Sequence, residues 1–209
     1  MNDSNGAATT DESAFRVETT PSFDTIAVAS SAGGLAALTQ LLSRLPAELP
    51  ASLLVVQHLD RRHKSLMADI LSRRTVLTVK QAEDGEPMEH STVYIAPPDK
   101  HLLANADRTL SLTQSELVHF VRPSADLLFE SVAAAFREHA IAVVLTGSGK
   151  DGAMGVKAIK KMGGTVITQD EETSEFFSMP SAAISTGQVD FILPVDEIPQ
   201  ALVALVVGA

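Results

Sequence analysis

The sequence contains no cysteine and no tryptophan, and it has a single tyrosine among 209 residues. Without cysteine, disulfides, a thiolate nucleophile and cysteine-ligated zinc or iron–sulfur sites are all excluded, which fits a cytoplasmic protein. The sequence also lacks an apolar run long enough to span a bilayer, and its first residues are acidic where a secretory signal would be basic. We therefore expect a cytoplasmic protein with no metal, no cofactor and no membrane insertion.

Basic residues are scarce as well. The chain has 16 lysines and arginines against 26 aspartates and glutamates, for a net charge of −10. Because binding to nucleic acid or to an anionic membrane relies on basic side chains that neutralise phosphate, this balance argues against both partners. Residues 1–22 are polar with no apolar period and are predicted to be a disordered tail, and 23–209 to be one domain.

Short apolar runs alternate with segments of helical period along this domain. Strands that are apolar on both faces are typical of a buried parallel sheet. The pattern predicts a doubly wound α/β fold with a mainly parallel sheet and helices on both faces. The expected strands are 25–30, 52–57, 141–147, 165–170 and 191–195, and the expected helices are 35–45, 59–74, 123–136, 153–163, a short one within 175–186, and 197–206.

The section from residue 75 to residue 114 follows another pattern. Apolar runs at 75–82 and 92–98 frame a turn, and 101–114 alternates around Asn105 like a hairpin. We expect this whole section to be antiparallel, as a flap or a small second sheet beside the main one.

Three side chains suited to acyl transfer follow the predicted strands. Ser31 comes after the first strand, His58 after the second, and Asp151 lies in the glycine-rich turn after the third. Ligands and chemistry in such folds gather at the carboxyl ends of the strands. A serine hydroxyl needs an imidazole as base, and the imidazole needs a carboxylate to orient it. The sequence therefore indicates a Ser-His-Asp triad, with the backbone N–H groups of Ala32 and Ser148 as oxyanion donors.

Simpler interpretations of the same residues remain open at this point. Ser31 and Asp151 are each good helix caps, Ser30 competes as nucleophile, and a histidine at the end of a buried strand is more often structural. The match to the G-x-S-x-G nucleophile motif is weak because Ala29 replaces the first glycine. The order Ser, His, Asp also differs from that of α/β-hydrolases. A nucleotide-binding turn is disfavoured because Ala29 and Ser31 stand where its first two glycines belong.

Several separated blocks carry a stronger signal than any single motif. From about Ile26 to the C-terminus, the chain resembles the catalytic domain of chemotaxis protein-glutamate methylesterases of the CheB type. The blocks are AVASSAGG, VVQHLDRRHKSL, AEDGEP with VYIAPPDKHL, RPSADLLFESVA, VVLTGSGKDGAMGVKAIKKMGG and SMPSAAI.

The resemblance implies a serine hydrolase that removes methyl esters from glutamate side chains on the cytoplasmic helices of chemoreceptors or of a related sensory protein. Some members of the family also deamidate receptor glutamines. The family's triad falls on Ser31, His58 and Asp151, and Arg122 matches an arginine that lies near the active site, where it could position substrate.

Two departures from the family pattern affect these expectations. Many members have threonine after the nucleophile where this chain has Ala32, and many carry an N-terminal receiver domain for which residues 1–25 are too short. We expect control by a separate receiver-domain protein, if any. The alternative to the esterase is a non-catalytic regulatory relative that binds a partner. A basic cluster at 61–64 is either a solvated loop or a patch that attracts an acidic receptor helix.

Overall fold

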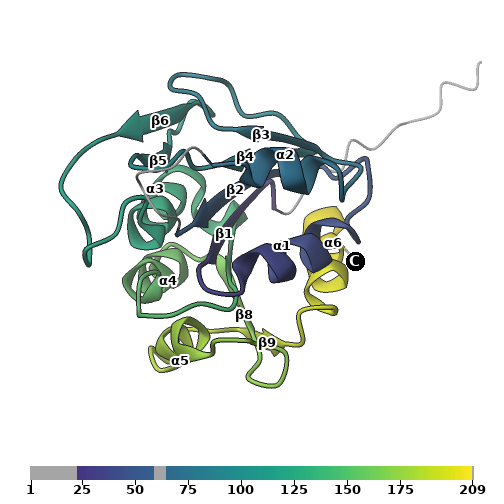
Figure 1. The fold of residues 1–209 in the computed structure, drawn as a ribbon, viewed down its shortest axis with the longest axis vertical. Helices are drawn as coiled ribbons and strands as arrows, with labels where there is room; N and C mark the ends of the chain where they lie inside the picture. Colours follow the sequence, from purple (N-terminus) through teal and green to yellow (C-terminus); the bar gives the residue numbers. More distant parts are fainter. Residues whose placement is uncertain (1–22, 59–64, 209) are drawn as a thin grey trace, which may run out of the picture.

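The computed structural model describes residues 23–58 and 65–208, so the predicted tail at 1–22 and the basic cluster at 61–64 lie outside the described residues. Seven strands form one parallel sheet in the order β3-β4-β2-β1-β7-β8-β9 (Figure 1). They are β1 (Thr25–Ser30), β2 (Ser52–Gln57), β3 (Thr78–Gln81), β4 (Thr92–Ile95), β7 (Ala140–Val144), β8 (Thr165–Gln169) and β9 (Phe191–Leu193).

Helices cover both faces of this sheet, as the alternating pattern predicts. On one face α1 packs against α2 and α6, and on the other α4 packs between α3 and α5 (Figure 1). The helices are α1 (Gly34–Leu42), α2 (Met67–Ser72), α3 (Ala125–Phe136), α4 (Ala153–Lys161), α5 (Ser178–Ile184) and α6 (Ile198–Val207), with a 3-10 turn η1 (Arg137–His139) after α3. The doubly wound α/β prediction is confirmed.

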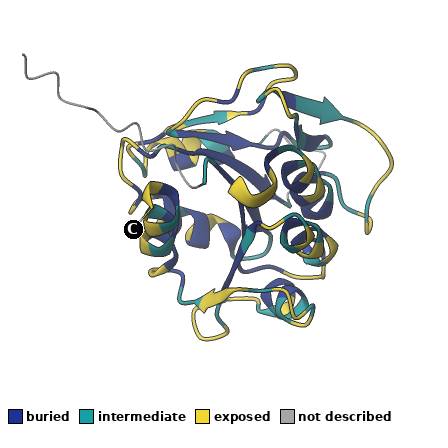
Figure 2. Cartoon of the chain, turned by 180° about the vertical axis from the view of Figure 1, so that it is seen from behind, coloured by how far each residue is buried: buried dark blue, intermediate teal, exposed yellow. Residues whose placement is uncertain are grey.

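The central strand β1 shows how one apolar run serves two cores. Successive side chains of a strand point to opposite faces, so Ile26 and Val28 join the core under α1, α2 and α6. Ala27 and Ala29 join the core under α3, α4 and α5. All four are fully buried. Figure 2 shows the same arrangement, with dark blue strands between helices whose outer surfaces are yellow.

The middle section is antiparallel only in part. β5 (His101–Ala104) and β6 (Leu110–Thr113) form the expected antiparallel hairpin as a separate two-stranded sheet. β3 and β4, however, pair in parallel at the edge of the main sheet, so the prediction for 75–98 is wrong. The turn at 83–90 belongs to a return connection, in which Pro87 bridges to Thr109 of the hairpin. Residues 82–91 thereby carry the chain back to the end of the sheet where β3 began.

Two phenylalanines offer a matched test of this core. Phe129 of α3 is fully buried, whereas Phe120 is 91% exposed. We expect Phe129→Ala to lower the free energy of unfolding by about 3–5 kcal/mol, because it removes apolar contacts and leaves a cavity. Phe120→Ala should change it by less than about 0.5 kcal/mol. Urea denaturation measures both, and equal losses would contradict the described packing.

Candidate active site

Two adjacent parallel strands place Ser31 and His58 beside each other. Ser30 pairs with Gln57 in the β1–β2 register, and neighbouring strands lie about 4.8 Å apart. The backbone N–H of His58 donates to the carbonyl of Ser30 at 3.1 Å. Both residues therefore leave the sheet at its carboxyl edge, next to each other, as the sequence predicts.

The hydroxyl of Ser31 does not cap the following helix. The N-cap of α1 is Gly33, in the left-handed conformation with φ of 75°, and no side chain caps that helix. Ser30, the competing serine, is fully buried and donates its hydroxyl to the Gln57 side chain at 2.6 Å. Of the two serines, Ser31 alone is partly exposed, which leaves it as the candidate nucleophile.

His58 and Asp151 form a direct pair. The imidazole Nε2 lies 2.8 Å from the carboxylate of Asp151, and the two side chains are 13% and 4% exposed. Because a carboxylate accepts, Nε2 carries the hydrogen and Nδ1 is left as the basic nitrogen. Among the described residues, no hydrogen bond joins His58 to the Ser31 hydroxyl. In unliganded active sites such bonds are often long and tighten only when substrate binds.

Asp151 is held by the N-terminus of α3 and not by α4, the helix it precedes. Its carboxylate accepts from the Ser124 hydroxyl at 2.8 Å and from the backbone N–H groups of Ala125 at 2.6 Å and Asp126 at 3.1 Å. Burial acts to raise the pKa of Asp151, but the hydrogen bonds from His58 and from these N–H groups outweigh it, and the net pKa is lowered. The carboxylate therefore stays ionised beside the imidazole.

A second serine and histidine also lie near Asp151, but their bonds do not make a catalytic triad. The buried His101 accepts the backbone N–H of Ser124 at its Nδ1, and its Nε2 bonds to the carbonyl of Glu116. The Ser124 hydroxyl gives its hydrogen to Asp151. Among the described residues no histidine bonds to that hydroxyl, so Ser124 and His101 support the carboxylate and do not form a second active site.

Glycine allows the loop after β7 to pass close to Ser31. A Cβ on Gly147 would lie 2.9 Å from the Cβ of Ser31 and 2.3 Å from the sulfur of Met179. Ala32 follows Ser31 in the chain, and Ser148 follows Gly147. Among the described residues neither of their backbone N–H groups has a hydrogen-bond partner, as oxyanion donors require.

Comparisons with known proteins identify the family to which the chain belongs. Residues 26–202 match the family model of the CheB methylesterase. The chain belongs to the CheB methylesterase family. It is similar to the crystal structure of the Thermotoga maritima CheB methylesterase catalytic domain, with a TM-score of 0.85 and 39% identity over 88% of this chain and 99% of that one.

This chain matches different shares of the length of its relatives in the CheB family. The protein-glutamate methylesterase/protein-glutamine glutaminase of Pyrococcus horikoshii is 39% identical over 87% of this chain, but the chain spans only 50% of that protein. A protein of Leptospira interrogans named as a putative enzyme of the same kind is 37% identical over 88% of this chain and is covered over 95% of its length.

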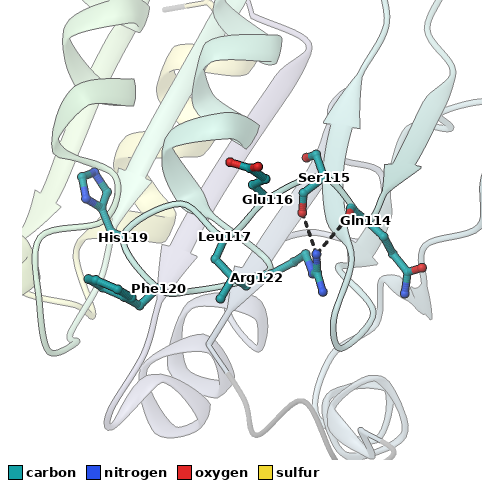
Figure 3. A pocket seen from close by; sticks show the side chains of 7 residues that line it. All are labelled: Gln114, Ser115, Glu116, Leu117, His119, Phe120 and Arg122. Carbon is teal, nitrogen blue, oxygen red and sulfur yellow. Dashed lines mark hydrogen bonds between the residues drawn. The ribbon is translucent and has the colours of Figure 1, made fainter.

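Arg122 bonds to its own segment and to Asp99 in the loop between β4 and β5. Its Nε and Nη2 donate to Asp99 at 3.1 and 2.8 Å. Its Nη1 donates to the carbonyls of Gln114 and Ser115 at 2.9 and 2.6 Å (Figure 3). Arg122 lines a hollow of about 710 Å³ together with residues 114–117, 119 and 120. These contacts support a role in holding the 114–122 segment, and direct binding of substrate by Arg122 stays a prediction.

Two cavities flank the catalytic edge in this CheB-family domain. One of about 260 Å³ is lined by His58, Asp151 and Ser148 together with His119 and Phe120. Another of about 740 Å³ contains Ser31 and runs along α1 and α2, where its lining includes Leu35, Met67, Ile70 and Arg74. Ser31 lines the larger of these two cavities, and His58 lines the smaller one.

The contacts by which Ser124 and His101 support Asp151 could not be found from the sequence. Ser124 caps α3, a role that a serine before a helix commonly has. Nothing local signals that this helix start also receives a carboxylate from 27 residues further along the chain.

Within the described residues no group of three or more acidic or histidine side chains could hold a metal ion. In the same part of the chain, no helix has the length and apolarity to cross a membrane.

The buried His101 predicts a pH effect on stability. Burial lowers the pKa of His101 below its value of about 6.5 in an unfolded chain. The contribution of the neutral His101 ring to the free energy of unfolding is therefore complete above about pH 6.5. It is lost as the pH falls below that value, because the unfolded chain takes up the proton before the folded chain does. We expect His101→Asn to remove this loss, so the stability gap between wild type and variant narrows from pH 8 to pH 5. Urea denaturation at each pH measures this gap, and parallel profiles would mean that His101 takes up its proton equally readily in the folded and the unfolded chain.

Proposed function

We propose that this protein is a protein-glutamate methylesterase that acts in the cytoplasm on methylated glutamates of chemoreceptor helices or of a related sensory protein. The contact of His58 with Asp151 beside Ser31 supports the proposal most directly. Membership of the CheB methylesterase family and the names of its relatives support the substrate class. A separate receiver-domain protein as regulator stays a prediction.

The first half-reaction forms an acyl-enzyme. The Ser31 oxygen attacks the ester carbonyl carbon while Nδ1 of His58 takes the hydroxyl proton. The negative charge that develops on the carbonyl oxygen is stabilised by the N–H groups of Ala32 and Ser148. The tetrahedral intermediate collapses as His58 passes the proton to the leaving methoxide, and methanol departs.

The second half-reaction releases the glutamate. Water enters where methanol left, His58 removes one of its protons, and the hydroxide attacks the acyl carbon. The Ser31 oxygen leaves and recovers its proton from His58. The same cycle would deamidate a glutamine side chain with ammonia as leaving group, and the relatives' names pair both activities.

Asp151 acts through the imidazole in both steps. Its bond to Nε2 fixes the tautomer that leaves Nδ1 basic and stabilises the imidazolium that forms. The four hydrogen bonds on the carboxylate hold it in place and ionised. Side chains on different strands and loops thus form one proton-transfer unit.

Substitution of the triad tests the reaction. We expect Ser31→Ala, His58→Gln and Asp151→Asn each to lower methanol release from a methylated receptor fragment by at least about 10³-fold, since the three residues act as a unit. The matched control is Ser115→Ala, an exposed serine outside the proposed chemistry. Wild-type protein that binds the fragment without releasing methanol would favour the non-catalytic alternative.

The Ser124→Ala variant tests which of the two serines near the Asp151–His58 pair is the nucleophile. We expect it to slow methanol release by about 10- to 100-fold, because the carboxylate loses one of its four donors and a hydrogen bond to a charged group contributes about 1.5–3 kcal/mol. The loss should stay well short of that in Ser31→Ala. The opposite ranking of the two variants would assign the nucleophile to Ser124.

A further inference from the structure

The side-chain amide of Gln57 connects the two halves of the active site. Its Nε2 donates to the backbone carbonyl of Ser31 at 2.7 Å and to that of His58 at 3.1 Å. Its Oε1 accepts the Ser30 hydroxyl at 2.6 Å. Gln57 is 5% exposed, so these bonds form out of water, where an unmade bond is costly.

The amide can be oriented in only one way. Both backbone carbonyls are acceptors, so the atom facing them has to be the NH₂ group. The Ser30 hydroxyl must then donate to Oε1 and cannot serve as a nucleophile. All three polar contacts of the side chain agree with one another, and the planar amide becomes a rigid link between the two carbonyls.

The start of α1 is built around this amide. A Cβ on Gly34 would lie 2.0 Å from Oε1 of Gln57 and 2.9 Å from the Cβ of Ser30. No side chain fits at that position while Gln57 keeps its place. The two glycines after Ser31 thus have separate tasks, since Gly33 makes the turn with its positive φ and Gly34 leaves room for the amide.

We propose that Gln57 is a positioning residue that sets the separation of the Ser31 hydroxyl and the His58 imidazole. Among the described residues no hydrogen bond joins Ser31 to His58 directly, and the Gln57 amide is the group that bonds to both. Proton transfer requires the two groups to approach to about 3 Å, and a displacement of about 1 Å can cost 10²-fold in rate. The inference rests on the proposed function only in taking these residues as nucleophile and base.

Labelling of the serine tests the proposal without the natural substrate. The rate at which a fluorophosphonate modifies Ser31, followed by mass spectrometry, measures the activation of that hydroxyl. We expect Gln57→Met to lower this rate about 10- to 100-fold while labelling still reaches one group per chain. In methanol release kcat should fall by a similar factor with KM changed less than about threefold.

Two further variants distinguish a positioning role of Gln57 from a general loss of protein stability. Asn105→Leu is the matched control, because the Asn105 amide also donates two hydrogen bonds but lies in the β5–β6 turn. It should leave labelling within about threefold of wild type at a similar loss of melting temperature. Ser30→Ala leaves the two donated bonds of Gln57 in place, so its labelling rate should fall less than that of Gln57→Met. If Gln57→Met does not fold, the Ser30→Ala variant still tests the proposal, because it removes one of the three hydrogen bonds of the Gln57 amide.

A pH comparison gives a readout that packing alone would not move. Gln57→Glu sets a carboxylate against two carbonyls, and protonation of that carboxylate restores one donor. We expect the labelling rate of Gln57→Glu divided by that of Gln57→Met to rise as the pH falls, because the protonated carboxylic acid regains a hydrogen-bond donor that methionine lacks at every pH.

The outcomes distinguish this inference from the proposed function. Normal labelling of Gln57→Met, equal losses in Asn105→Leu, or a wild-type Ser31 that does not react would each overturn the positioning role. Wild-type protein that is labelled at Ser31 but releases no methanol would overturn the esterase proposal. The role of Gln57 would then stand on the labelling rates alone.

Discussion

The candidate catalytic edge depends on one buried contact, the hydrogen bond between His58 and Asp151. A carboxylate that is 4% exposed would ordinarily take up a proton, because burial disfavours the charged form. The start of α3 offsets this by directing a hydroxyl and two backbone N–H groups at Asp151, at the end of the helix where its dipole is positive. The orientation of the imidazole follows from that anchored charge.

The parallel sheet supplies the remaining geometry. β1 lies between β2 and β7, so the loops that follow these three strands leave the sheet at adjacent points of one edge. Close approach at this edge needs positions without side chains. Gly34 leaves room for the Gln57 amide, and Gly147 lets the loop after β7 pass Ser31. The glycines of the family blocks thus have steric reasons that go beyond flexible turns.

The structure assigns several local patterns that the sequence left open. Ser31 and Asp151 precede helices and could each have been a cap, but Gly33 and Gly152 hold the N-cap positions and no side chain caps either helix. The 75–98 section was expected to be antiparallel because a turn separates two short apolar runs. Its parallel pairing depends on a longer return path that bonds to the β5–β6 hairpin, and such a distant contact leaves no periodic signal.

The sequence alone determined the doubly wound fold and the candidate triad. Apolar period and glycine-rich turns are local properties, and parallel strands bring their carboxyl ends to one edge whatever the loops do. Only the tertiary structure decided which atoms meet there. It placed Asp151 on the start of α3, left Nδ1 of His58 as the basic nitrogen, turned Arg122 toward its own loop and set the Gln57 amide between two backbone carbonyls. These are contacts between residues far apart in the chain, and their direction depends on packing that no short stretch encodes.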